Sequence, residues 1–217
     1  MLLREDKMSF LRSCDINILL IRKEGIMKNK EEITRLLIVV DMINGFVKEG
    51  KLSDSYINHI TPRIVSLIER FIRSEDGIMF ACDSHSENCN EFKSFPVHCV
   101  SGSYESEIID ELKPYVKYGV VYKKNSTNMM YAPSFIKDID SLSNLNEVII
   151  SGCCSDICVL NLAISMKTYF DQNDRDVIVR VPSNMIETYN SLEHDRREYN
   201  DMALKLMRQC GIKTGVM

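Results

Sequence analysis

Three features are missing from this chain of 217 residues, and each absence excludes a class of protein. The longest apolar runs, such as residues 36–40, have only the length of a strand, so we expect no transmembrane helix. The net charge is only −4 without any basic run, so nothing indicates a nucleic-acid or membrane partner. No internal repeat or low-complexity tract follows residue 33. With 45% hydrophobic residues, the chain can fill one core, and its length favours a single domain.

A disulfide framework is also missing. The chain has eight cysteines, but two of them, Cys153 and Cys154, are adjacent, which does not look like a disulfide-rich secreted domain. The spacing of these two and Cys158 is not C-x-x-C either, which gives little support to a redox or structural metal site. We therefore expect a reducing, cytoplasmic setting.

The beginning of the chain differs from the rest. Residues 1–33 carry mixed charge, and their acidic residues are too early and too frequent for a signal peptide. We expect an N-terminal extension there, either flexible or at a subunit contact, with Met27 as a candidate for the natural start. Residues 34–217 are expected to form one domain.

Beyond this extension, apolar runs of strand length alternate with apolar stripes of helical spacing. Strands are predicted over residues 36–40, 77–82, 119–122, 147–151, 176–181 and 212–214, and helices over 56–74, 105–112, 158–170 and 192–209. Pro62 is expected to mark the first turn of its helix, and the closing helix has Leu192, Met202, Leu206 and Met207 among its apolar positions. Such alternation predicts an α/β protein with a doubly wound sheet.

Residues 147–170 contain the first candidate for a catalytic site. They predict a buried strand, a Gly-Cys-Cys-Ser-Asp turn and then Cys158 at the start of a helix. At that position free N–H groups and the helix dipole favour a thiolate, so the pKa of Cys158 should fall and its nucleophilicity should rise. The alternative is that Cys158 is a small core residue, because free cysteine is often buried.

Charged residues follow two other predicted strands. Asp41 comes directly after the first strand, at the edge where open α/β sheets place their sites, and is a candidate catalytic acid. The alternative is that Asp41 caps the tight turn that follows. Lys123 and Lys124 follow the third strand, where a lysine inside a cleft could hold a thiolate and a carboxylate together. On the surface, the two lysines would only be solvated.

Two histidines and two carboxylates occur after the second predicted strand. They are Asp83, His85, Glu91 and His98. This set suits Zn²⁺, Fe²⁺ or Mn²⁺, with water or substrate in the open positions. The alternative is that these loop residues are simply solvated.

The chain contains the stretches VVDMINGF, CDSH, EFKSFPVHC, YKKNSTN and SGCCSDICV. Together they resemble the signature blocks of the nicotinamidase/isochorismatase-like cysteine hydrolase superfamily, from roughly residue 36 to the C-terminus. The resemblance implies a six-stranded, mainly parallel sheet with helices on both faces. Members commonly form homo-oligomers, so the resemblance also implies a homo-oligomer here.

The resemblance implies an Asp-Lys-Cys catalytic triad. Its members would be Asp41, Lys124 and Cys158, with Lys123 as the second choice for the lysine. The family also carries a non-proline cis peptide bond before the nucleophile, which falls here between Cys153 and Cys154. That bond would turn the N–H of Cys154 towards an oxyanion, beside the N–H of Cys158.

Metal ligation divides the superfamily, and nicotinamidase-like members resemble this chain. The implied ligands are Asp83, His85, Glu91 and His98, which would hold a divalent ion, Zn²⁺ or else Fe²⁺ or Mn²⁺. Glu87 is close enough in sequence to compete with Glu91. Phe46 and Phe95 fall at positions that flank an aromatic amide ring in such enzymes, although core packing would also explain both.

The reaction that the resemblance implies is the conversion of nicotinamide to nicotinate and ammonia, which feeds NAD salvage. Asp41 would take the proton of Cys158, and the thiolate would form a thioester with the substrate. One alternative is another hydrolase of the superfamily, acting on a different small amide, an N-carbamoyl group or an isochorismate-like substrate. A second alternative is a non-catalytic oligomeric partner, for which Cys158 would be unreactive.

Overall fold

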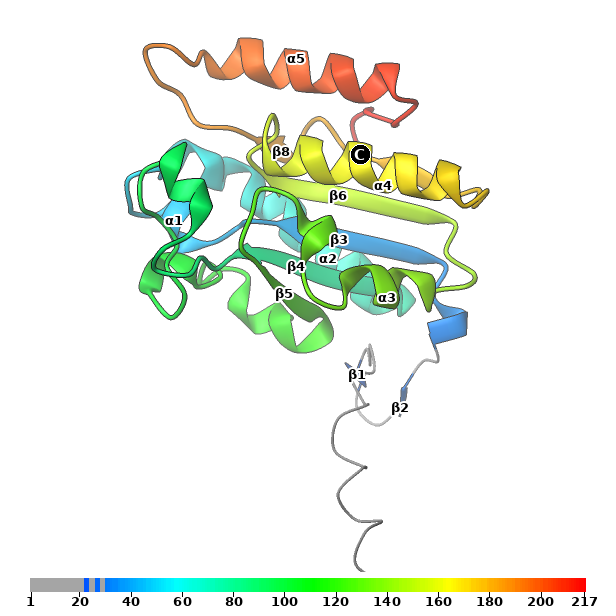
Figure 1. Ribbon diagram of the computed structural model, residues 1–217. Helices are drawn as coiled ribbons and strands as arrows, with labels where there is room; N and C mark the ends of the chain where they lie inside the picture. The colour runs from blue at the N-terminus through cyan, green and yellow to red at the C-terminus, as the bar shows by residue number, and fades with distance from the viewer. Residues whose placement is uncertain (1–21, 24–25, 28–29) are drawn as a thin grey trace, which may run out of the picture.

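Five parallel pairings join the six strands of the central sheet in the computed structural model, which describes residues 22–23, 26–27 and 30–217. The strands follow the order β5-β4-β3-β6-β7, and β8 pairs with β6 beyond the end of β7 (Figure 1). Their bounds are Arg35–Val40 for β3, Gly77–Asp83 for β4, Val120–Lys124 for β5, Glu147–Cys153 for β6, Ile178–Arg180 for β7 and Ile186–Glu187 for β8. This arrangement confirms the predicted doubly wound, six-stranded parallel sheet.

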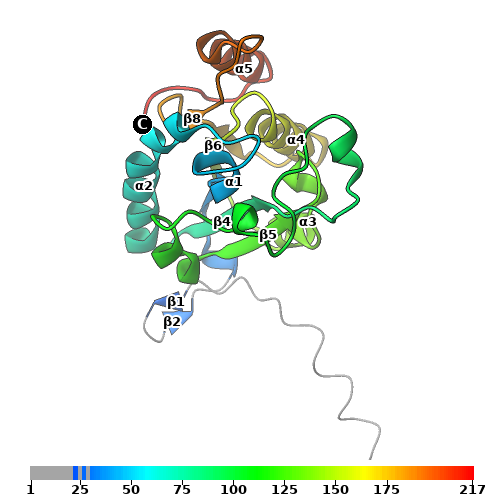
Figure 2. The same cartoon turned by 90° about the vertical axis from the view of Figure 1, so that its left-hand side faces the viewer.

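Helices cover both faces of this sheet. The α-helices are α1 (Asn44–Val47), α2 (Thr61–Ser74), α3 (Phe135–Asp140), α4 (Cys158–Gln172) and α5 (Arg196–Gln209). The 3-10 helices are η1 (Lys30–Glu32), η2 (Ser55–Ile60), η3 (Asn90–Lys93), η4 (Tyr104–Ser106), η5 (Lys113–Tyr118) and η6 (Met129–Tyr131). Figure 2 shows α2 on one face and α3 and α4 on the other, with α5 beyond α4 near β8.

Much of the expected N-terminal extension lies outside the described residues. Within it, β1 (Arg22–Lys23) and β2 (Ile26–Met27) pair with each other in an antiparallel arrangement. Ile33, the last residue assigned to the extension, is fully buried in the core. The extension as a separate segment stays a prediction.

Helix α2 shows how the sequence pattern produces the packing. Its residues Ile64, Leu67, Ile68 and Phe71 are spaced three or four apart, so they share one face, and all four are buried against the sheet. Pro62 lies in the first turn, where its missing N–H leaves no intrahelical hydrogen bond unmade. The predicted helix from residue 56 is confirmed from Thr61 onwards, whereas its first turns are the 3-10 helix η2.

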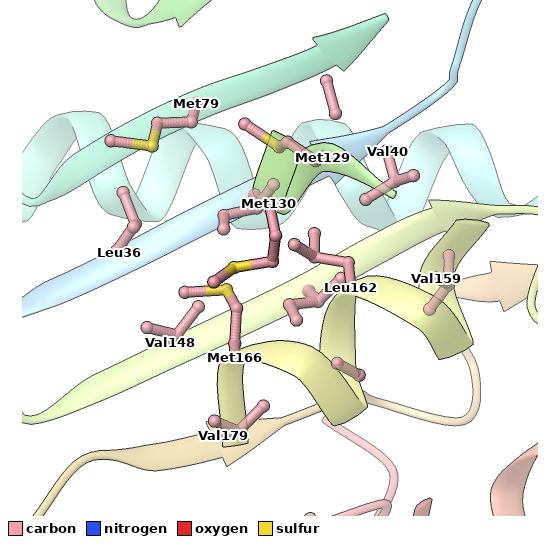
Figure 3. Packing of buried hydrophobic residues seen from close by; sticks show 14 of the residues in the cluster. Leu36, Val40, Met79, Met129, Met130, Val148, Val159, Leu162, Met166 and Val179 are labelled. Atoms are coloured by element: carbon pink, nitrogen blue, oxygen red, sulfur yellow. The ribbon is translucent and has the colours of Figure 1, made fainter. Parts of the chain in front are cut away.

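The opposite face of the sheet is packed by α4. Figure 3 shows Val159, Leu162 and Met166 of this helix against strand residues such as Leu36 and Val148, and all of these side chains are buried. Their contacts remove apolar surface from water, which is the main favourable contribution to folding. The helix therefore fixes its first residue, Cys158, relative to the sheet.

Three predicted elements are wrong. No α-helix forms over residues 105–112, where the end of η4 is followed by Ile108, which bridges Ile43 in an extended conformation. The closing helix begins at Arg196, because Asp195 caps it by accepting hydrogen bonds from two N–H groups of its first turn, which leaves Leu192 exposed in the preceding turn. Residues 212–214 form only an isolated bridge to β7, and the sixth strand is β8.

The closing helix also differs from its predicted apolar face. Met202 and Leu206 are exposed, whereas Met207 is buried together with Ala203. No helix within the described residues is long and apolar enough to cross a membrane. The seven cysteines in the described part of the chain are all free.

Replacement of a core leucine tests this packing. Leu162→Ala removes a fully buried side chain of α4, so we expect the free energy of unfolding to fall by about 2–5 kcal/mol. The matched change Leu206→Ala, on the exposed side of α5, should cost less than about 1 kcal/mol. Urea unfolding of both variants measures the difference, and equal losses would contradict the described core.

Candidate active site

The carboxyl ends of four neighbouring strands, β5, β4, β3 and β6, bring the predicted catalytic residues together. Asp41 follows β3, Asp83 ends β4, Lys124 ends β5, and Cys158 comes after β6 at the first position of α4. The chain runs from β3 outwards to β5 and then returns to β6 on the other side of β3, so the strand order reverses at this edge. A crevice at such a reversal is where open α/β sheets bind their ligands.

Asp41 is buried at the centre of this edge. Its Oδ1 accepts a hydrogen bond from the N–H of Asp83 at 2.9 Å, and its Oδ2 lies 2.8 Å from the Nζ of Lys124. Burial raises the pKa of Asp41, and the nearby Asp83 carboxylate raises it further, to about 7 despite the opposing charge of Lys124. Asp41 can therefore exchange a proton near neutral pH, as a general base and acid must.

Lys124 connects the charged groups. Its buried Nζ donates hydrogen bonds to Asp83 and to the Sγ of Cys158, the latter at 3.6 Å. Burial alone would lower the pKa of Lys124, but the charges of Asp41 and Asp83 outweigh it and raise the pKa well above its usual value. Lys123 is exposed on the other side of the strand. The alternation of β5 thus selects Lys124 as the lysine that meets Asp41 and Cys158.

The Cys158 thiol lies in the same cluster. The side-chain atoms of Asp41, Asp83 and Cys158 that could bind a metal are all within 4.8 Å of one another. Burial raises the pKa of the thiol well above its usual value, Lys124 opposes this rise, and the charges of Asp41 and Asp83 add to it. The predicted lowering by the helix N-terminus is therefore wrong, because burial beside two carboxylates dominates. The resting thiol keeps its proton until a neighbouring base removes it.

The turn before the nucleophile has the expected backbone. The peptide bond between Cys153 and Cys154 is cis, as the resemblance implied. Gly152, just before it, has φ of +114°, and a Cβ there would come within 2.0 Å of the carbonyl oxygen of Val40. Only glycine fits this position. Cys154 and Cys158 both line the pocket, and the N–H of Cys158, in the first turn of α4, has no intrahelical partner and is free to bind an oxyanion.

The four predicted metal ligands also converge. The Nε2 atoms of His85 and His98 are 3.1 Å apart, and each lies 3.7–4.0 Å from carboxylate oxygens of Asp83 and Glu91. Four ligands at about 2.0–2.1 Å from a zinc ion in a tetrahedron are about 3.4 Å from one another. The observed separations therefore fit a divalent ion at the centre of the cluster.

The surroundings of the two histidines orient them for such an ion. The Nδ1 of His98 donates to the carbonyl of Pro96 at 2.8 Å, which leaves its Nε2 free to bind metal. The Nδ1 of His85 contacts the Sγ of Cys89 at 3.5 Å. Burial and the Asp83 charge raise the pKa of Glu91. Glu87 is exposed and outside the cluster, so Glu91 is the better ligand.

A small pocket opens beside both groups of residues. Its empty volume is about 420 Å³, including the part open to solvent, which suits a small molecule. Phe46 and Phe95 line it as expected, with ring centroids 5.7 and 6.3 Å from that of His98, although Phe46 also packs in the core. Sequence reasoning missed four further lining residues in loops without a periodic signal. They are Leu52, Thr127, Ile157 and Tyr189.

Comparison with known proteins gives a family match. The model of the isochorismatase domain matches residues 35–215. An uncharacterized isochorismatase family protein, PncA of Bacillus subtilis (strain 168), is 30% identical over 140 residues, which cover 60% of this chain and 76% of that protein.

Solved structures with the same fold include several amidases. Nicotinamidase PncA from Bacillus subtilis has a TM-score of 0.71 at 24% identity, covering 84% of this chain and 99% of its own. N-carbamoylsarcosine amidase from Thermoplasma acidophilum has a TM-score of 0.70 at 22% identity, covering 85% and 96%. Pyrazinamidase of Pyrococcus horikoshii in complex with zinc has a TM-score of 0.69 at 22% identity, covering 84% and 99%. At these identities the three structures establish the fold alone.

Metal affinity tests the ligand cluster. Glu91→Gln should weaken Zn²⁺ binding at least tenfold, because it replaces a charged ligand, and even partners outside the ligand shell are worth about 10–100-fold. The matched change Glu87→Gln should leave affinity unchanged, since Glu87 lies outside the cluster. Competition titration with a chromophoric chelator measures both. The opposite ranking of the two variants would show that Glu87 is the ligand.

Proposed function

The chain belongs to the isochorismatase family of hydrolases, and from this premise we propose that it is an amidase of the nicotinamidase type. It converts nicotinamide and water to nicotinate and ammonia. The position of Asp83 carries the proposal, because one carboxylate oxygen binds Lys124 while the other faces His85 and His98. The nucleophile and the metal cluster thus share one pocket, which suits a substrate with both a carboxamide and a metal-binding ring nitrogen.

The first half of the reaction forms a thioester. Asp41 takes the proton of the Cys158 thiol while the sulfur attacks the carboxamide carbon, and the electron pair of the C=O bond moves to oxygen. The N–H groups of Cys154 and Cys158 stabilise this oxyanion, and one such donor is worth about 2.7–4 kcal/mol. Asp41 then gives its proton to the amide nitrogen as the C–N bond breaks. Ammonia leaves, and the acyl group stays on the sulfur.

The second half releases the acid. Asp41 accepts a proton from a water molecule that attacks the thioester, and it returns this proton to the sulfur of Cys158 as the C–S bond breaks. Lys124 stays protonated throughout, because two carboxylates hold its charge in a buried site. Its contact with the Sγ of Cys158 stabilises the transient thiolate.

The proposed role of the metal cluster is to bind the substrate ring rather than to transfer protons. Asp83, His85, Glu91 and His98 would hold a divalent ion, and the zinc in the pyrazinamidase structure supports Zn²⁺ as that ion. When bound, it offers a Lewis-acid contact to the ring nitrogen and so orients the ring. Phe46 and Phe95 confine the ring from the sides of the pocket.

The setting belongs to the same proposal. A cytoplasmic enzyme that returns nicotinate to NAD synthesis agrees with the free thiols of the described cysteines. Homo-oligomer formation is part of the proposal and rests on the family resemblance alone.

A second candidate substrate follows from one fold neighbour, the N-carbamoylsarcosine amidase. An N-carbamoyl group is attacked by the same triad, because its carbonyl carbon also carries a leaving nitrogen. It needs no ring nitrogen and therefore no metal contact. Turnover of a carbamoyl compound that survives removal of the metal would favour this candidate over nicotinamide.

Ammonia release from nicotinamide tests the proposed function. We expect turnover by the purified protein, loss of at least 99% of it after chelation, and recovery after addition of Zn²⁺. Cys158→Ala should abolish turnover, because it removes the sulfur that contacts Lys124 and forms the thioester. Turnover that persists in Cys158→Ala would overturn the mechanism, and turnover of benzamide as fast as nicotinamide would overturn the role of the ring nitrogen.

The lysine pair offers a matched control for this experiment. Lys124→Ala should lower kcat by at least 100-fold, because it removes the cation that contacts both Asp41 and Cys158. Lys123→Ala should keep wild-type kcat, since its side chain is exposed. Thermal unfolding of both variants separates a loss of fold from a loss of catalysis.

A further inference from the structure

Tyr189 lines the active-site pocket without a role in the reaction described so far. It follows β8 and lines the same pocket as Cys154, Ile157 and Cys158. Its side chain is neither part of the triad nor of the metal cluster. Contacts with His194 hold its ring in place.

The ring of Tyr189 is the first member of a three-ring stack. It lies parallel to the imidazole of His194, with 3.9 Å between the ring centroids and an angle of 12°. The other face of His194 stacks on Tyr199 of α5, at 3.6 Å and 26°. His194 covers one face of the Tyr189 ring, so only the uncovered part of this ring can line the pocket.

Hydrogen bonds fix the central ring at two points. The Nδ1 of His194 lies 3.0 Å from the carbonyl oxygen of Tyr189, and its Nε2 lies 2.9 Å from the Oδ2 of Asp156. Both His194 and Asp156 are buried. Asp156 comes two residues before Cys158, so the stack is tied to the loop that carries the nucleophile.

We propose that Tyr189 is the wall against which the flat ring of the substrate packs beside Cys158, and that His194 is the positioning residue that holds this wall. The inference rests on the proposed function in one respect, namely that the substrate is an aromatic amide. Phe46 and Phe95 lie beside His98 of the metal cluster, and Tyr189 lines the same pocket as Cys158, so three aromatic side chains are available to the ring.

Kinetics with nicotinamide give the first test. Contact with a flat ring acts equally on bound substrate and transition state, so Tyr189→Leu should raise KM about two- to tenfold and leave kcat nearly unchanged. Tyr131→Leu, at an exposed tyrosine, is the matched control and should change neither. An unchanged KM in Tyr189→Leu would overturn the proposal.

A double-mutant cycle tests the role of His194. In His194→Gln the side-chain amide can still donate to Asp156 but cannot stack, so it should raise KM in the wild-type background. In the Tyr189→Leu background the same change should have no further effect, because a positioning residue acts only through the residue it positions. Equal effects in both backgrounds would show that His194 acts independently of Tyr189 and would contradict the proposal.

Alkylation of Cys158 tests the role of Tyr189 without requiring that the protein hydrolyses nicotinamide. We would compare the rates at which iodoacetamide and N-benzyliodoacetamide modify Cys158, located by peptide mass spectrometry. The preference for the aromatic reagent should fall about two- to tenfold in Tyr189→Leu and in His194→Gln. If nicotinamide is not hydrolysed but this preference falls, the proposed substrate is wrong and the proposed role of Tyr189 is supported. If the preference is unchanged in both variants, the wall is wrong.

Discussion

The buried Nζ of Lys124 lies between the carboxylates of Asp41 and Asp83, and the rest of the active site depends on this contact. Two carboxylates cannot both stay charged in a buried site unless a cation compensates them. Removing one partner from such a cluster typically costs about 3–5 kcal/mol, because the remaining charges are left uncompensated. Lys124 therefore keeps Asp83 charged and available to a metal ion, and it moderates the pKa of Asp41, which burial and Asp83 bring to about 7.

The sheet makes this contact possible. Parallel strands place their carboxyl ends at one edge, so residues that end three different strands meet without any loop having to reach far. Helix α4 packs its apolar face on the same sheet and begins at Cys158, which fixes the sulfur 3.6 Å from Lys124. Asp83 then extends the cluster to His85 and His98. The proposed catalytic and metal-binding groups are thus parts of one charged network rather than two separate sites.

Part of this site could be predicted from the sequence, because three of its key residues lie directly at a strand end. Asp41, Asp83 and Lys124 follow or end apolar runs, and such runs predict buried strands. The choice between Lys124 and Lys123 could not be made from the residues alone, since it depends on which face of β5 meets the site. The choice between Glu91 and Glu87 has the same difficulty, because a loop has no regular period from which the direction of a side chain could be predicted.

Other features depend on contacts between distant residues, and sequence patterns do not carry that information. The short strand β8 forms only because β6 offers it a free edge, and the 3-10 and extended segments over residues 104–118 replace a helix because Ile108 bridges Ile43. The pKa of Cys158 rises instead of falling, because burial and two carboxylates outweigh the helix N-terminus. The stack of Tyr189, His194 and Tyr199 likewise arises from a turn that brings three separate rings together.

The central claim is that Cys158 forms a covalent acyl intermediate with an aromatic amide. The most direct measurement is rapid acid quenching of the metal-loaded protein during turnover of nicotinamide, followed by mass spectrometry of the peptide that contains Cys158. The mechanism predicts a nicotinoyl group on the sulfur of Cys158 that disappears when the substrate is exhausted. Turnover without any acyl group on Cys158, under conditions that preserve thioesters, would contradict it.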